Sequence, residues 1–109
     1  MGGYQHPLDV SNMLDIAINT LAARIVELGD GPLVNGRFLG SAGIGPGLNL
    51  VLRAANTNNH QTTRGVLRAA LVALRGYMQE WGFGEVFLLI FDGQTLVGKA
   101  AIITEPAGA

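Results

Sequence analysis

The sequence predicts a small α+β protein, a two-layer sandwich in which two helices lie on a mainly antiparallel sheet of about four strands. Two long segments repeat apolar residues every three or four positions, as amphipathic helices do. Shorter segments carry the alternating or continuous apolar runs that are typical of strands. They follow one another in the order helix, strand, strand, helix, strand, strand. The 109 residues contain no stretch that resembles a linker, so we expect one domain over residues 1–109.

The first helix is expected over residues 9–28. Asp9 or Ser11 is expected to cap its N-terminus, because a short side-chain oxygen accepts hydrogen bonds from free backbone N–H groups. Gly29 is a typical left-handed helix stop. The core-facing stripe is spaced four, three, four and three residues apart and consists of Leu14, Ile18, Leu21, Ile25 and Leu28.

A glycine-rich segment separates two strands expected over residues 33–39 and 48–54. It is not a dinucleotide-binding fingerprint, because Leu48 stands where the third glycine belongs and a strand follows instead of a helix. It is not a P-loop either, since no Gly-Lys-Ser/Thr follows. The pattern favours a bend between the strands over the alternative, a backbone nest that binds an anion.

The second half of the chain predicts a helix followed by a hairpin. The helix is expected to begin at Thr62 or Thr63 and to end at Trp81. Strands are expected over residues 83–91 and 96–104, joined by a type I′ turn at Asp92-Gly93. Glu85 is expected to pair diagonally with Lys99 across this hairpin.

The first strand of that hairpin is apolar on both faces, which implies cover on both. One face carries Phe87, Leu89 and Phe91. The two expected helices can cover only one face of a sheet, so we expect the other face to be buried against a second copy of the chain. The side chains expected to form this self-association face are Val86, Leu88 and Ile90.

The composition excludes several classes of site. There is no cysteine, hence no disulfide, thiolate metal site or cysteine nucleophile. The only histidines, His6 and His60, have no partner at ligand spacing, so we expect no metal. No catalytic constellation and no cofactor motif is present, and the chain is expected not to be an enzyme. Only 14% of the residues are charged and the net charge is −1, which favours association and disfavours nucleic acid as a partner.

Three arginines form a stripe on the second expected helix: Arg64, Arg68 and Arg75. Their spacing of four and seven residues keeps them on one side of the helix. The pattern favours a solvated face of an amphipathic helix. The alternative is a stripe that binds an anion or a lipid headgroup.

Residues 62–98 resemble a segment of small uncharacterised fungal proteins, in which a threonine-capped helix leads into a hairpin ending in I-x-D-G. Here the helix is TTRGVLRAALVALRGYM and the hairpin is VFLLIFDG. The order of helix and hairpin is more loosely similar to secreted α/β-sandwich proteins of fungi, such as killer toxins and effectors. This resemblance transfers no site residue. Together with the high hydrophobicity and the arginine stripe, it motivates the alternative of a membrane-active or effector-like secreted protein.

The function expected from the sequence is therefore that of a non-enzymatic, self-associating interaction protein, a homodimer or larger. The first alternative is a secreted fungal membrane-active, effector-like or killer-toxin-like protein that contacts a membrane surface. The second is a small enzyme or ligand-binding protein with an apolar pocket between helices and sheet. The chain begins with no signal peptide, which a mature secreted form would also lack, so its compartment stays open.

Overall fold

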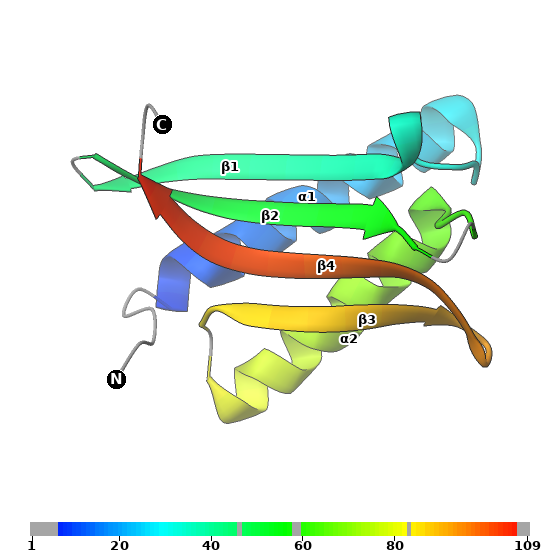
Figure 1. The fold of residues 1–109 in the computed structure, drawn as a ribbon. Helices are drawn as coiled ribbons and strands as arrows, with labels where there is room; N and C mark the ends of the chain where they lie inside the picture. Colours follow the sequence, from blue (N-terminus) through cyan, green and yellow to red (C-terminus); the bar gives the residue numbers. More distant parts are fainter. Residues whose placement is uncertain (1–6, 46, 58–59, 83, 107–109) are drawn as a thin grey trace.

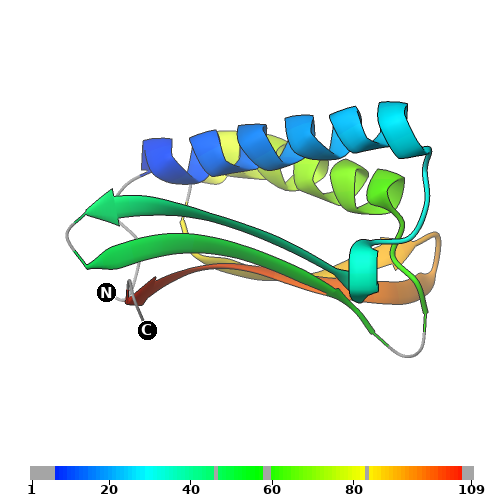
Figure 2. The same cartoon turned by 90° about the horizontal axis from the view of Figure 1, so that it is seen from above.

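The computed structural model describes residues 7–45, 47–57, 60–82 and 84–106 (Figure 1). Two helices lie side by side on one face of a four-stranded antiparallel sheet, which confirms the predicted α+β sandwich (Figure 2). A 3-10 turn, η1 (Val34–Gly36), precedes the first strand. The helices are α1 (Pro7–Leu28) and α2 (Arg64–Trp81), and the strands are β1 (Arg37–Gly45), β2 (Leu48–Asn56), β3 (Val86–Asp92) and β4 (Thr95–Pro106).

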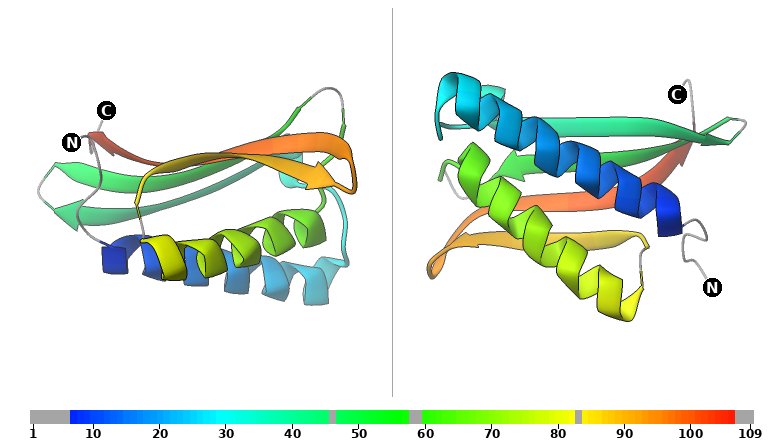
Figure 3. Two further views of the ribbon diagram at one scale, coloured as in Figure 1. Left: turned by 90° about the horizontal axis from the view of Figure 1, so that it is seen from below. Right: turned by 180° about the vertical axis from the view of Figure 1, so that it is seen from behind.

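The strands lie in the order β1-β2-β4-β3, so β2 and β4 are central and β1 and β3 form the two edges. Each hairpin pairs its own two strands, and β4 pairs antiparallel with β2 to join them. Strand β4 ends and α1 begins at the same end of the molecule (Figure 3). If the elements are read along the chain from β4 and then from α1 onward, they run β-α-β-β-α-β. This is a circularly permuted form of the split βαβ arrangement.

The core lies between the helices and the sheet. Alternate residues of β2, among them Leu50 and Leu52, point toward the helices and are fully buried. Ile102 of β4 pairs with Leu52 in register and is buried on the same face. The helices contribute an apolar stripe each: Leu14 and Leu21 from α1, and Leu67 and Leu71 from α2.

A polar junction fixes the start of α2. Thr63 caps the helix by accepting a hydrogen bond from Val66 N. Asp30 Oδ1 accepts from Gly65 N at 2.8 Å, so a second side chain satisfies a free N–H of the first turn. Behind it, the buried Thr62 hydroxyl donates to Val97 O at 2.8 Å, which ties the junction to β4.

Several boundaries differ from those predicted. Strand β3 begins at Val86 and β4 ends at Pro106, and residue 83, where the first of these strands was expected to begin, lies outside the described residues. Helix α1 begins at Pro7, so Asp9 lies inside its first turn instead of capping it; a carboxylate there interacts favourably with the helix dipole. The strand expected over residues 33–39 was placed too early, because η1 occupies its start and Asn35 has a φ of 53°. Strand β1 instead runs to Gly45, so three of the glycines lie within a strand and are not a bend.

The β3–β4 turn also differs from the prediction. Asp92 pairs with Thr95, which makes Gly93 and Gln94 the two central residues. Only Gly93 has a positive φ, 64°. A type I′ turn needs positive φ at both central positions, so this turn has the type II′ pattern, with glycine at the first.

Candidate functional site

The face of the sheet opposite the helices has no layer over it in the part of the chain that the structure describes (Figure 3). We call it the open face. The strand register fixes its members, because side chains alternate along each strand and Leu50, Leu52 and Ala54 point the other way. The open face carries Arg37, Leu39 and Ser41 of β1, Val51, Arg53 and Ala55 of β2, Phe87, Leu89 and Phe91 of β3, and Lys99, Ala101 and Ile103 of β4.

The self-association residues predicted from the sequence were assigned to the wrong face. Ile90 is 1% exposed and belongs to the core, and Val86 and Leu88 pack against that core from the same side. The physical reason is that α2 covers this side of β3. The exposed series is the other one: Phe87 is 79% exposed and Leu89 is 61% exposed. The prediction that β3 is apolar on both faces is confirmed.

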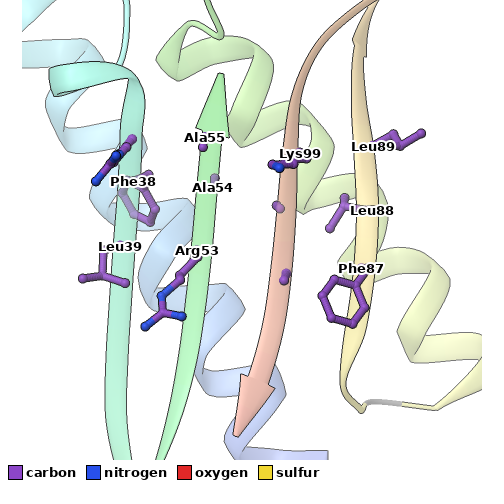
Figure 4. A pocket seen from close by; sticks show the side chains of 12 residues that line it. Phe38, Leu39, Arg53, Ala54, Ala55, Phe87, Leu88, Leu89 and Lys99 are labelled. Carbon is purple, nitrogen blue, oxygen red and sulfur yellow. The ribbon is translucent and has the colours of Figure 1, made fainter. Parts of the chain in front are cut away.

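The open face is hollowed along its middle. On the central strands it carries the small side chains Ala55 and Ala101 beside the longer Arg53 and Lys99. The edge strands carry Leu39, Phe87 and Leu89 (Figure 4). The large residues form two walls and the alanines form the floor of a hollow of about 690 Å³. We call this hollow the trough. Its other lining side chains on the open face are Arg37, Arg53 and Lys99.

An ion pair closes the open face beyond one end of the trough. Arg53 Nη1 lies 2.5 Å from Glu105 Oε2, and Arg53 Nη2 donates to Glu105 Oε1 at 3.0 Å. In register, Arg53 lies beside Ala101 and Glu105 lies beside Asn49, so the pair spans the row between them, Val51 and Ile103. This explains why Val51 is only 4% exposed on a face that no helix covers.

Lys99 is the cation at the centre of the trough. In register it lies between Ala55 on β2 and Leu89 on β3, so both cross-strand neighbours are apolar. The predicted pair with Glu85 is wrong: Glu85 Oε2 instead accepts hydrogen bonds from Thr104 N and Thr104 Oγ1. Lys99 has no ion-pair or hydrogen-bond partner among the described residues.

Arg37 is the second such cation. It lies on β1 beside Ala55, in the same cross-strand row as Lys99. The described residues provide no partner for it either. The only carboxylate of the open face within the described ranges, Glu105, already pairs with Arg53. The trough therefore has two uncompensated positive charges between apolar walls.

The arginines of the α2 stripe mostly form contacts within the molecule or are buried in it. Arg64 is 9% exposed and its Nη1 donates to Gly29 O at 3.2 Å, next to the end of α1. Arg75 Nε lies 2.5 Å from Asp15 Oδ1 and links α2 to α1. Arg68 Nε is buried and has no hydrogen-bond partner in the described part of the chain. The predicted solvated face thus lies partly against α1, and the structure does not group the three guanidinium groups into one exposed site.

A second, smaller hollow of about 400 Å³ lies between α1 and the edge strand β1. Met13 and Ile16 of α1 and Phe38 of β1 line its apolar part. Elsewhere the space between helices and sheet is filled by the side chains of the core. The expected apolar pocket between helices and sheet is represented at most by this groove at the edge.

The described ranges contain no cluster of three or more His, Asp or Glu residues placed to hold a metal ion. Neither described helix has the length and apolar character that a membrane span requires. The sequence missed Arg37, Leu39, Ala55 and Ala101 as site residues. The alternation of side chains along each strand could have assigned these residues to a face. The strand order that brings the four of them together cannot be derived from that alternation.

Comparison of the chain with protein-family models, with curated proteins and with solved structures finds no match. The resemblance of residues 62–98 to fungal proteins therefore stays a prediction.

Proposed function

We propose that this protein is a non-enzymatic, self-associating interaction protein whose copies join along strand β3. The observation that carries the proposal is the chemistry of this edge. Between Val86 and Phe91 the strand has no charged side chain and no proline. Phe87, Leu89 and Phe91 expose more than half of their surface on it.

An unprotected edge of this kind is rare because it offers unpaired backbone groups to any other strand. Proteins usually blunt such edges with lysine, proline or a short strand. The other edge of this sheet differs: β1 carries Arg37, contains glycines, and is flanked by α1. The selective lack of protection on β3 supports a role for that edge in pairing.

The natural partner for β3 is a second β3 related by a two-fold axis. Antiparallel pairing of the two copies would join two four-stranded sheets into one continuous sheet. The last turns of α2 project beyond β3 in Figures 1 and 3, and they carry the exposed aromatic residues Tyr77 and Trp81. Burial of these rings together with the β3 side chains would bring the contact toward the roughly 800 Å² per partner of a stable interface.

Sedimentation equilibrium at micromolar concentration tests the proposal. The wild-type chain is expected to be a dimer or larger. Leu89→Lys places a charge in the middle of β3 without touching the core, and it is expected to give monomer. The matched control is Leu39→Lys, which makes the same change on the same face at the opposite edge and is expected to leave the association intact.

Two results would refute this assembly. A wild-type chain that is monomeric across the micromolar range would remove self-association altogether. Equal dissociation by the Leu39 and Leu89 variants would move the contact from the β3 edge to the open face as a whole. Circular dichroism of both variants establishes that the fold is retained.

A further inference from the structure

We propose that the trough is a binding site for a small aliphatic carboxylate, a molecule with an apolar body and a single negative head. Two features of the described residues point to such a ligand. One is the shape that the side chains give to the open face, and the other is the charge left unpaired within it.

The shape suits one small apolar body. The walls are Leu39 of β1 on one side and Phe87 and Leu89 of β3 on the other (Figure 4). Ala55 and Ala101 make the floor. Its volume of about 690 Å³ lies within the range of sites that bind small ligands. An alkyl chain that lies along the alanine floor would remove both walls from water.

The charge decides the chemistry of the occupant. A purely apolar ligand would bury Lys99 without compensation, which is costly because an unpaired charge loses its hydration. The carboxylate that the register places on the open face, Glu105, is held by Arg53. A negative group brought by the ligand would instead pair with Lys99, with Arg37 in the same row across Ala55. An anionic head with an apolar tail satisfies both the walls and the cations.

The same balance disfavours other occupants. A second copy stacked face to face would add its own Lys99 and Arg37 to a region that is already positive. Single-stranded nucleic acid needs a groove with many cationic contacts along its backbone, and the trough offers three cations, one of them paired with Glu105.

This inference does not rest on the proposed self-association. Pairing along the β3 edge extends the sheet sideways and leaves the middle of the open face accessible. Either proposal can therefore fail while the other stands, and sedimentation of each variant alongside the binding measurement separates the two.

The test is a titration with sodium decanoate below its micellar concentration, followed by calorimetry and by backbone amide NMR shifts. Decanoate is expected to bind and to shift the amides of β2 and β4 around the trough. Decanol, which has the same chain without the charge, and decyltrimethylammonium are expected to bind at least tenfold more weakly, because a charge-assisted hydrogen bond is worth about that factor.

Variants locate the site. Lys99→Met keeps the apolar stem and is expected to lower the affinity for decanoate about tenfold, whereas Lys99→Arg is expected to retain it. The matched control is Arg24→Met on α1, which removes one exposed positive charge away from the trough and is expected to have no effect. Ala55→Leu fills the floor and is expected to block binding while leaving the core face untouched.

Three outcomes would overturn the proposal: equal affinity for decanoate and decanol, unchanged affinity in Lys99→Met, or amide shifts confined to the groove between α1 and β1. Tighter binding of a thymidine octanucleotide than of decanoate, lost in Lys99→Met, would assign the trough to single-stranded nucleic acid instead.

Discussion

The two faces of the sheet share a backbone but differ in what their side chains do. On the covered face Leu50, Leu52 and Ile102 are fully buried against the helices. On the open face the central strands carry the small Ala55 and Ala101 together with Arg53 and Lys99, and the edge strands carry Leu39, Phe87 and Leu89. One face is thus packed for stability, and the other is hollowed and charged in a way that contributes little to stability. The comparison teaches that the role of an apolar residue in a strand, in the core or on an exposed surface, can be assigned only when it is known whether another layer covers its face.

The largest expected effect separates the two faces directly. Leu52→Ala on β2 removes a side chain with no exposed surface and leaves a cavity under the helices, and it is expected to destabilise the fold by about 3 kcal/mol. Leu89→Ala on β3 makes the same chemical change on the open face, where the side chain is largely exposed, and is expected to cost less than about 0.5 kcal/mol in the monomer.

Urea denaturation of both variants measures the difference, at a protein concentration where the wild-type chain is monomeric. The dimer would add its own stabilisation at higher concentration. Similar losses in the two variants would mean that the open face is also packed, and the distinction between the faces would fail.

The sequence predicted the elements and their order because those depend on local periodicity. Thr63 caps α2 and Gly82 ends it, at the boundaries that the sequence predicts. The faces of β3 could not be assigned in the same way. Val86, Leu88 and Ile90 are as apolar as Phe87, Leu89 and Phe91, so only the position of α2 decides which series is covered.

The trough could not be predicted from the sequence, for a related reason. Its floor combines Ala55 with Ala101, which come from different hairpins, and Lys99 faces Ala55 only because β2 pairs with β4. Pairing between distant strands is set by the packing of the whole chain and not by any local pattern. The start of β1 was placed too early because the apolar residues before it outweighed Asn35-Gly36, a dipeptide that favours the positive φ both residues adopt.

A smaller effect is expected at the polar junction, where the covered face meets the start of α2. A Cβ at Gly98 would collide with Thr62 Oγ1 and lie 2.9 Å from Ala55 O. Gly98→Ala is therefore expected to destabilise the fold by about 2 kcal/mol, because a backbone carbonyl cannot move aside as a side chain can. Thermal unfolding followed by circular dichroism measures the loss.

The comparison variant is Gly76→Ala on α2, where the added Cβ would meet no atom within 4 Å apart from the neighbouring residues and backbone of its own helix. It is expected to be neutral or slightly stabilising, since alanine is the better helix former. If Gly98→Ala were as harmless as Gly76→Ala, the close contact of β4 with Thr62 would not be a packing constraint.

The smallest effect is expected from the ion pair that covers Val51 on the open face. Both partners are partly exposed to water, with 55% of the Arg53 side chain and 29% of the Glu105 side chain accessible. A double-mutant cycle with Arg53→Met and Glu105→Gln is expected to give a coupling free energy of about 0.5 kcal/mol, reduced in molar salt, because screening and side-chain entropy offset most of the attraction. The burial of Val51 then comes from the aliphatic stem of Arg53, which Arg53→Met largely retains. A coupling free energy of several kcal/mol that is insensitive to salt would instead mean that the pair is buried. Part of the open face would then contribute to the stability of the fold as the face under the helices does.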